Sequence, residues 1–292
     1  MISAARIRRF LRKSRAEQLR AVRATLRHRS GAASGEHIRC SIKISGSAAT
    51  AELDGRKATL SHRGSGADRG AILQCFEQLQ YEIPELRPRY RSHAQAFYDA
   101  ILAAGRIPLI VDGGANIGAS VLWFSLRYPR AHIVAIEPAR DNFLYLGRNA
   151  RSCDADLRAA AIGAVDGVTL LSDPGEGEWG YRTGAPSGGG YEVPVVSIET
   201  ILADKPATRY EPFLLKLDIE GAERSLFAGD LTSMARFPVI AIEPHDWLFP
   251  GERTASGFFS FHGEAGRDFA FRAENVFSID YPRIASPGTG AP

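Results

Sequence analysis

Four carboxylates follow short apolar runs that are typical of buried β-strands, and they are Asp112, Glu137, Asp218 and Glu243. The carboxyl ends of parallel strands meet at one edge of an open α/β sheet, which is where such sheets bind ligands. We therefore expect the four carboxylates to face a common cleft. Carboxylates in that position can bind a cation, accept hydrogen bonds or take up a proton.

The run from Leu109 to Val111 leads into a glycine-rich turn that ends at Gly118, and apolar residues at helical spacing follow over 119–128. Glycine lets the backbone turn tightly and approach a ligand closely. At the last strand position, Asp112 would repel a pyrophosphate, whereas it suits a ligand that carries an ammonium and a sulfonium, such as S-adenosylmethionine (SAM). The alternative is an ordinary buried strand that ends in a glycine turn.

Glu137 lies 19 residues after Gly118, which is the spacing of the acidic residue that accepts hydrogen bonds from a ribose hydroxyl pair. A carboxylate there also disfavours the 2′-phosphate of NADP. Helix capping or an exposed strand end is the alternative role for Glu137. Ala161, at the end of the third predicted strand, is expected near the adenine of the cofactor, unless the strand end simply packs in the core.

Lys216, Asp218 and Glu220 alternate along the fourth predicted strand, so they share one side of it. A lysine inside a central strand is rarely tolerated unless a carboxylate pairs with it. The fifth predicted strand leads to Glu243 and His245, which add a carboxylate and an imidazole at the mouth of the cleft. The alternative is a structural ion-pair network, in which Lys216 pairs with Asp218 or Glu243 and takes no part in chemistry.

The length of 292 residues allows one large domain with an appendage, and the composition is ordinary for a globular protein. The first 30 residues hold ten Lys and Arg residues and one Glu, which leaves the rest of the chain with a net charge of −6. An acidic body does not suit a nucleic-acid groove, so we expect no nucleic-acid partner. Three scattered cysteines favour a reducing compartment, and no apolar run approaches the ~20 residues of a transmembrane helix. We expect a cytoplasmic protein.

Alternating strand and helix patterns over residues 106–285 predict an α/β domain with a mostly parallel sheet. The predicted strands are 109–112, 133–137, 157–162, 213–218 and 239–243, followed by a closing pair at 269–271 and 276–281. We expect loops over 173–190 and around Phe258, Phe259 and Phe261.

Two further segments precede this domain. Residues 36–105 are expected to form a small α+β cap over one side of the cleft, with a hairpin turn at Asp54-Gly55 and helices at 71–79 and 92–104. Residues 1–35 are expected to form a basic helical arm, and residues 286–292 a disordered tail.

Two motifs are specific when taken together. Asp112 to Gly118 has the pattern D-x-G-A-N-x-G, and Lys216 to Glu223 has the pattern K-x-D-x-E-G-A-E. With Glu137-Pro138 between them, they make residues 63–280 resemble the FkbM family of SAM-dependent methyltransferases. The resemblance implies a Rossmann-like class I methyltransferase fold, with a seven-stranded sheet and helices on both faces. One departure is Gly113, where the family more often has a hydrophobic or small β-branched residue.

The resemblance also implies the site residues. They are SAM contacts from Asp112, Gly114, Asn116, Gly118 and Glu137, and a site near Asp218, Glu220 and Glu243. From the strand patterns themselves we also expect Asp218 to contact SAM, and we add Lys216 and His245 to Asp218, Glu220 and Glu243 as the predicted catalytic group.

Family members typically methylate hydroxyl groups of sugars, polyketides or related small molecules, so the resemblance implies an O-methyltransferase. An alcohol is a poor nucleophile, and a base has to take its proton as the methyl group is transferred. With an unperturbed pKa of ~6.5, His245 is the first choice for this base, and Asp218 or Glu220 is the second. Alternatively, Asp218, Glu243 and His245 could bind Mg²⁺, which would lower the pKa of the hydroxyl. Acceptor specificity is expected from exposed side chains on loops, namely Trp179, Tyr181, Arg182, Trp247 and Phe249.

Two other functions stay open at this point. One is an NAD-dependent oxidoreductase, which Asp112 and the absence of G-x-G-x-x-G at the turn disfavour. The other is a SAM-binding protein without turnover. The sequence also leaves open whether the chain forms a homo-oligomer.

Overall fold

The computed structural model describes residues 38–86, 89–172, 182–183, 190–220 and 222–287. Contacts divide the chain into Met1–His37 and Ile38–Pro292, and the second unit is described here. The predicted arm and most of both the predicted tail and the loop over 173–190 lie outside the described residues. Within the described part of the chain, no helix combines the length and the apolar character needed to cross a bilayer.

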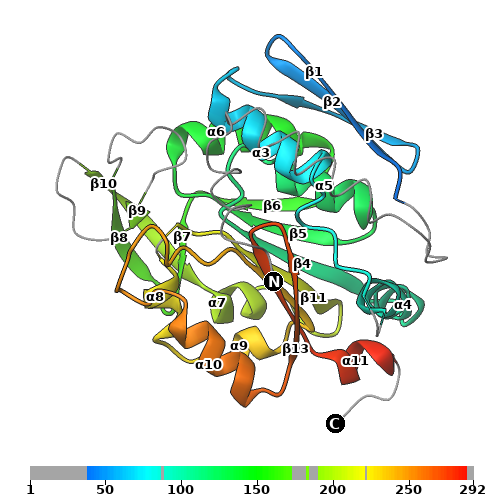
Figure 1. Ribbon diagram of the computed structural model, residues 1–292, viewed down its shortest axis with the longest axis vertical. Coiled ribbons are helices and arrows are strands. Elements are labelled where there is room, and N and C mark those ends of the chain that lie inside the picture. Colours follow the sequence, from blue (N-terminus) through cyan, green and yellow to red (C-terminus); the bar gives the residue numbers. More distant parts are fainter. Residues whose placement is uncertain (1–37, 87–88, 173–181, 184–189, 221, 288–292) are drawn as a thin grey trace, which may run out of the picture. The chain divides into compact units, whose positions relative to one another are not determined.

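A seven-stranded sheet with the order β13-β14-β12-β11-β4-β5-β6 forms the centre of this unit (Figure 1). The strands are β4 (Ile107–Gly113), β5 (His132–Ile136), β6 (Ala155–Arg158), β11 (Tyr210–Leu217), β12 (Val239–Ile242), β13 (Asp268–Arg272) and β14 (Asn275–Ile279). β4, β5, β6, β11 and β12 pair in parallel, whereas β14 is antiparallel to both of its neighbours. This is the predicted Rossmann-like class I methyltransferase fold, and the strand order reverses between β4 and β11.

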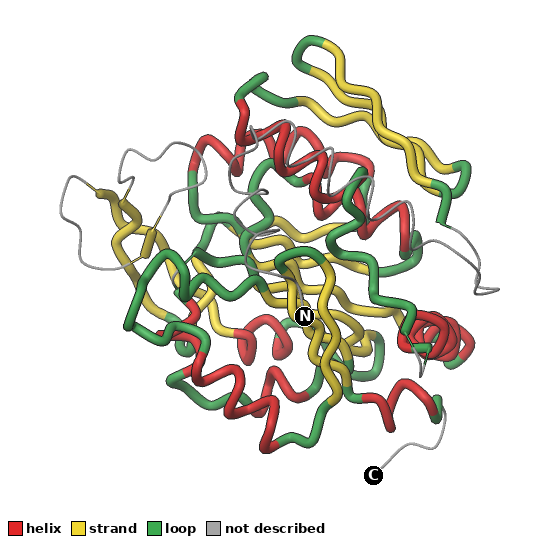
Figure 2. Tube along the Cα trace, in the orientation of Figure 1, coloured by secondary structure: helices red, strands yellow, loops and turns green. Residues whose placement is uncertain are grey.

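Helices cover both faces of the sheet (Figure 2). They are α3 (Gly66–Phe76), α4 (Tyr90–Ala103), α5 (Ala119–Arg127), α6 (Arg140–Asn149), α7 (Ile198–Ala203), α8 (Glu223–Phe227), α9 (Thr232–Ala235), α10 (Ser256–Glu264) and α11 (Tyr281–Ala285), with a 3₁₀ turn at Ala150–Ser152. Successive residues of β4 point to opposite faces: Ile110 joins the core under α3, α4 and α5, whereas Leu109 and Val111 join the core under α7 to α10. Burial on both faces explains why this strand is a continuous apolar run.

An N-terminal sheet of β1 (Cys40–Ser45), β2 (Ala48–Leu53) and β3 (Arg56–Ser61) precedes the helices. The predicted hairpin turn is confirmed, with positive φ at Asp54 (47°) and Gly55 (84°). Ala51 and Leu60 of this sheet belong to the same hydrophobic core as α5. The division between a cap and a methyltransferase domain at residue 105 stays a prediction.

The third predicted strand, 157–162, is wrong as a single element. β6 ends at Arg158, and β7 (Ala161–Gly163) enters a second, four-stranded sheet of order β7-β10-β8-β9. The other strands of this sheet are β8 (Gly167–Ser172), β9 (Arg182–Thr183) and β10 (Gly190–Ser197). The chain turns out of the main sheet after Arg158, whose carbonyl accepts a hydrogen bond from the N–H of Ala160 at 2.9 Å. The sequence pattern could not reveal this break, because no glycine or proline marks it and apolar residues occur on both sides.

The predicted loop around Phe258 is also wrong, because this stretch forms the helix α10. Glycine, serine and phenylalanine give it little intrinsic helix propensity, so packing decides its structure. Gly257 allows α10 to lie directly against α8, since a Cβ at this position would come within 2.7 Å of the Cβ of Phe227. Phe258 is fully buried against Phe227, with ring centroids 5.6 Å apart.

Candidate functional site

The glycine-rich turn after β4 has a backbone that only glycine can adopt at one central position. Gly114 has a φ of 76°, and a Cβ there would lie 1.8 Å from the carbonyl oxygen of Asp218. The N–H groups of Gly114 and Ala115 both donate to the carbonyl of Ile136, each at 3.0 Å. The turn is thereby held between the ends of β5 and β11, at the point where the strand order reverses.

Glu137 follows β5 and is fixed by backbone donors. Its Oε2 accepts the N–H of Asn116 at 2.8 Å, and its Oε1 accepts the N–H of Ala139 at 2.9 Å. Burial raises the pKa of Glu137 to about 7, although these hydrogen bonds and one from Asn142 act in the opposite direction. The carboxyl group is therefore poised to change its charge near neutral pH.

A cleft of about 570 Å³, part of which is open to solvent, lies over these residues. Of the predicted cofactor residues, Gly114, Asn116, Glu137, Ala161 and Asp218 line it. Asn142, Ile162, Glu220 and Ala222 are among its other lining residues. The walls combine apolar surface with a few polar groups, as the walls of small-molecule pockets do.

Two predicted cofactor residues do not line this cleft. Gly118, with a φ of 88°, begins α5, and a Cβ there would come within 3.0 Å of Leu146. Asp112 is fully buried and bound to other residues: its Oδ1 lies 3.0 Å from Nζ of Lys216, and its Oδ2 accepts the hydroxyl of Ser120 at 2.6 Å.

Lys216 lies opposite Asp112 in the pairing of β11 with β4, and only 1% of its side chain is exposed. Its ammonium donates to the carbonyl of Gly114 at 2.6 Å and lies 3.7 Å from Asp218. Burial lowers the pKa of Lys216, but Asp112 and Asp218 outweigh burial and raise it. The ion pair that the sequence suggested for Lys216 is present, although its nearest partner is Asp112.

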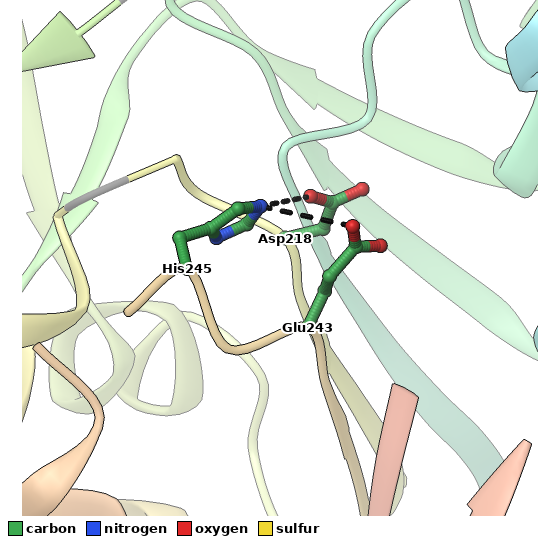
Figure 3. A group of neighbouring side chains, drawn as sticks. All are labelled: Asp218, Glu243 and His245. Atoms are coloured by element: carbon green, nitrogen blue, oxygen red, sulfur yellow. Dashed lines mark ion pairs between the residues drawn. The ribbon is translucent and has the colours of Figure 1, made fainter. Parts of the chain in front are cut away.

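Asp218, Glu243 and His245 converge at the ends of β11 and β12 (Figure 3). Nε2 of His245 lies 3.6 Å from Oδ1 of Asp218 and 3.8 Å from Oε1 of Glu243. One oxygen or nitrogen atom from each of the three residues lies within 4.8 Å of the others, so the group could also hold a cation. Because Asp218 also lines the cleft, this cluster adjoins the predicted cofactor site.

The imidazole of His245 is fixed from behind by Glu223. Its Nδ1 lies 2.5 Å from Oε1 of Glu223, a fully buried carboxylate, so Nε2 is the atom that faces Asp218 and Glu243. Burial lowers the pKa of His245, but the bond to Glu223 and the nearby carboxylates outweigh it and raise the pKa to about 9. The expectation of an ordinary pKa of ~6.5 is therefore wrong. The surroundings of His245 in the ligand-free site therefore favour the imidazolium form.

The pKa values of the neighbouring carboxyl groups are also raised, which favours their neutral form. Burial and the charge of Asp218 raise the pKa of Glu220 to about 9 and that of Glu243 to about 8. Glu220, which has a φ of 42°, turns the chain at the end of β11 and lines the cleft. The structure therefore brings Asp218, Glu220, Glu243 and His245 together, and the buried ammonium of Lys216 also lies 3.7 Å from Asp218.

Three residues of this site were not assigned a role from the sequence. Gln80 donates to Oε2 of Glu243 at 2.9 Å, and the hydroxyl of Tyr81 lies 3.3 Å from Oδ2 of Asp218. Both are buried and come from the segment after α3. Their contacts span 163 and 137 residues, so no local pattern could reveal them. Glu223, by contrast, is the last residue of the K-x-D-x-E-G-A-E motif, so the motif could have indicated that it belongs to the site.

The residues expected to select the acceptor are only partly described. Trp179, Tyr181 and the side chain of Arg182 lie outside the described residues. Trp247 follows β12 and is 70% exposed, and Phe249 is half-buried. Their role in specificity stays a prediction.

Comparison with known proteins gives one family. The model of the methyltransferase FkbM domain matches residues 112–265, and no curated protein matches the chain. A solved precorrin-6y C5,15-methyltransferase from Geobacter metallireducens is 14% identical, with 65% of this chain and 86% of that chain covered and a TM-score of 0.33. A putative caffeoyl-CoA O-methyltransferase from Staphylococcus aureus is 11% identical, with 71% and 90% covered and a TM-score of 0.34. Similarities of this size are remote and do not bear on the acceptor.

Proposed function

Because the chain belongs to the FkbM family of methyltransferases, whose domain model matches more than half of it, we propose that it transfers a methyl group from SAM to a hydroxyl of a small molecule. Sugars and polyketides are the acceptor classes that we favour. One observation carries the proposal: Asp218 belongs both to the cleft and to the cluster with Glu243 and His245. A donor site and a group of proton acceptors therefore share a residue.

The residues of the cleft suit SAM, which would supply a methyl group on a positively charged sulfur. Gly114 leaves backbone space that any Cβ would fill. Glu137 would accept a hydrogen bond from a ribose hydroxyl through Oε2, which has a second lone pair beyond its bond from Asn116, whereas Oε1 accepts from both Ala139 and Asn142. Asp218 would place negative charge near the cationic groups, and Glu220, whose pKa is raised, would lose its proton more readily beside such a ligand. In this proposal Asp112 does not contact SAM directly, because it is the buried counter-ion of Lys216.

In this proposal His245 takes the proton of the acceptor hydroxyl through Nε2. Glu223 holds the ring in place, so that Nε2 faces Asp218, which lines the cleft. The raised pKa of about 9 means that His245 has to lose its proton before it can act as a base. It loses that proton more readily once a cationic ligand stands beside Asp218, because positive charge nearby lowers the pKa of every group in the cluster.

Asp218, Glu243 and His245 are also the candidate ligands for a divalent cation. Mg²⁺ binds through carboxylate oxygens, and this group offers two carboxylates beside the imidazole nitrogen. A bound cation would lower the pKa of a coordinated hydroxyl. In that case His245 would be a ligand and not a base. The two roles predict different responses to a chelator.

The test combines binding and turnover. Calorimetric titration should show heat of binding with SAM and none with NAD, and mass spectrometry should detect S-adenosylhomocysteine in the presence of a methylated product from a panel of neutral hydroxylated acceptors. His245→Ala should lower kcat by about 100-fold or more, with little change in the Kd of SAM. His93→Ala is the matched control, because His93 lies on α4 and not at the cleft.

Absence of SAM binding would overturn the proposed donor. Binding without turnover on any acceptor would instead support a SAM-binding protein that is not an enzyme. Unchanged turnover in His245→Ala would remove His245 from the reaction. Turnover that EDTA abolishes and Mg²⁺ restores would assign the cluster to a cation.

A further inference from the structure

The strand β13 ends the seven-stranded sheet, and in the described part of the chain no other strand pairs with its outer edge. An edge strand presents unpaired N–H and C=O groups, and proteins commonly block such edges with lysine, proline or a bulge. β13 reads Asp-Phe-Ala-Phe-Arg from Asp268 to Arg272 and contains neither lysine nor proline. Its pairing with β14 runs without a register shift.

The outer side of β13 is strongly apolar. Phe269 is 55% exposed and Phe271 is 61% exposed, and their ring centroids lie 5.4 Å apart. The apolar surface continues onto α10, where Phe259 is 47% exposed. The buried ring of His262, also on α10, lies 5.3 Å from that of Phe269. We call Phe259, Phe269 and Phe271 the aromatic edge. Contiguous exposed apolar surface of this kind typically marks an interaction site.

The sequence of β13 is complementary to itself when one copy is reversed. We propose that β13 pairs in antiparallel fashion with β13 of a second copy of the chain, with Ala270 on the two-fold axis. In this register Asp268 lies opposite Arg272 of the second copy, and Phe269 lies opposite Phe271. Each strand thus gains two oppositely charged pairs and two aromatic pairs, which are the cross-strand pairs that stabilise sheets.

Self-complementarity is what favours a second copy over an unrelated strand. A two-fold interface uses the same surface on both subunits, so a residue and its partner must exchange roles across the axis. The order acidic, aromatic, small, aromatic, basic satisfies this requirement at all five positions. One oxygen of Asp268, Oδ2, already accepts the hydroxyl of Tyr90 at 3.2 Å, and Oδ1 is not used in that bond.

The proposal does not depend on the proposed function, although the turn that follows β13 reaches the cluster through Glu274, which shares a hydrogen bond with Glu243. No residue of β13 lines the cleft, and none belongs to the cluster of Asp218, Glu243 and His245. Pairing would join the two seven-stranded sheets into one continuous sheet and cover both copies of the aromatic edge.

Sedimentation equilibrium of the full chain tests the proposal. The wild-type protein should be a dimer, and Phe271→Lys should weaken self-association by about 100-fold, because the substitution acts twice in a symmetric interface and removes an aromatic contact each time. Leu144→Lys is the matched control, since Leu144 lies on α6 and is 61% exposed. Methyl transfer should be the same in both variants at concentrations where each is folded.

Cross-linking tests the register itself. Under mild oxidation, Ala270→Cys should form a disulfide-linked dimer, because the two copies of residue 270 face each other across the axis. Phe271→Cys should not, since Phe271 faces Phe269 of the second copy, and the wild-type chain controls for its own three cysteines. A wild-type monomer at every concentration would overturn the proposal. So would a dimer that persists in Phe271→Lys, or one that cross-links through residue 271 and not through 270.

Discussion

Lys216→Met should destabilise the protein by about 3–5 kcal/mol, because it strands a buried carboxylate. The side chains of Lys216 and Asp112 are 1% and 0% exposed, and their charged atoms lie 3.0 Å apart. At an effective dielectric constant of ~20, Coulomb's law gives about 5 kcal/mol of attraction at that distance. Methionine keeps the length of the side chain but removes the charge, so Asp112 loses its counter-ion and Gly114 loses a hydrogen-bond donor.

The sharper form of this prediction is a rescue by a second substitution. Adding Asp112→Asn to Lys216→Met removes the stranded charge, and asparagine can still accept the hydroxyl of Ser120. The double variant should therefore recover about 2 kcal/mol relative to Lys216→Met alone.

Urea unfolding, followed by circular dichroism and analysed by linear extrapolation, measures these differences. Lys57→Met is the control, because Lys57 pairs with Glu52 at 3.5 Å on the surface and is 67% exposed. That control should cost at most about 0.5 kcal/mol. A cost below about 1 kcal/mol for Lys216→Met, or a double variant less stable than Lys216→Met, would show that the pair does not support the fold as described.

Two further predictions concern the cofactor cleft. Gly114→Ala should abolish detectable SAM binding in a calorimetric titration and destabilise the fold by at least ~2 kcal/mol. The reason is that the new Cβ would collide with the carbonyl of Asp218 and that the φ of residue 114 is positive. Gly147→Ala is the control and should bind SAM normally, because a Cβ at that position meets no atom within 4 Å. The affinity for SAM should rise as the pH passes upward through about 7, because ionisation makes Glu137 a better acceptor for the ribose hydroxyls. Glu137→Gln should remove that part of the pH dependence, and an unchanged pH profile in this variant would exclude Glu137 as its source.

The sequence allowed the central part of this fold to be predicted because its signals are local. The apolar run before Asp112 and the glycine turn behind it are read within ten residues, and the structure confirms both. The ends of parallel strands must meet at one edge, so the proximity of Asp218 and Glu243 followed from the strand pattern alone.

The remainder depends on contacts between distant parts of the chain. The pKa of His245 is set by Glu223 and by carboxylates at the ends of two strands. The sequence does not give the distances from the imidazole to these carboxylates, so it could not predict the raised pKa. Gln80 reaches Glu243 from a segment that sequence patterns describe only as the end of a helix. The helix α10 forms because Gly257 can lie against Phe227, which is a property of the partner surface and not of the helix sequence.

The bond from Lys216 to the carbonyl of Gly114 joins residues 102 positions apart. During synthesis, the ribosome releases the glycine turn long before the lysine that supports it from below. A nascent or truncated chain that stops before β11 thus has the first motif but not the support beneath it. We expect such a chain to be unable to capture the methyl donor, so that competence for the ligand arises only late in folding, when the fourth parallel strand has been added.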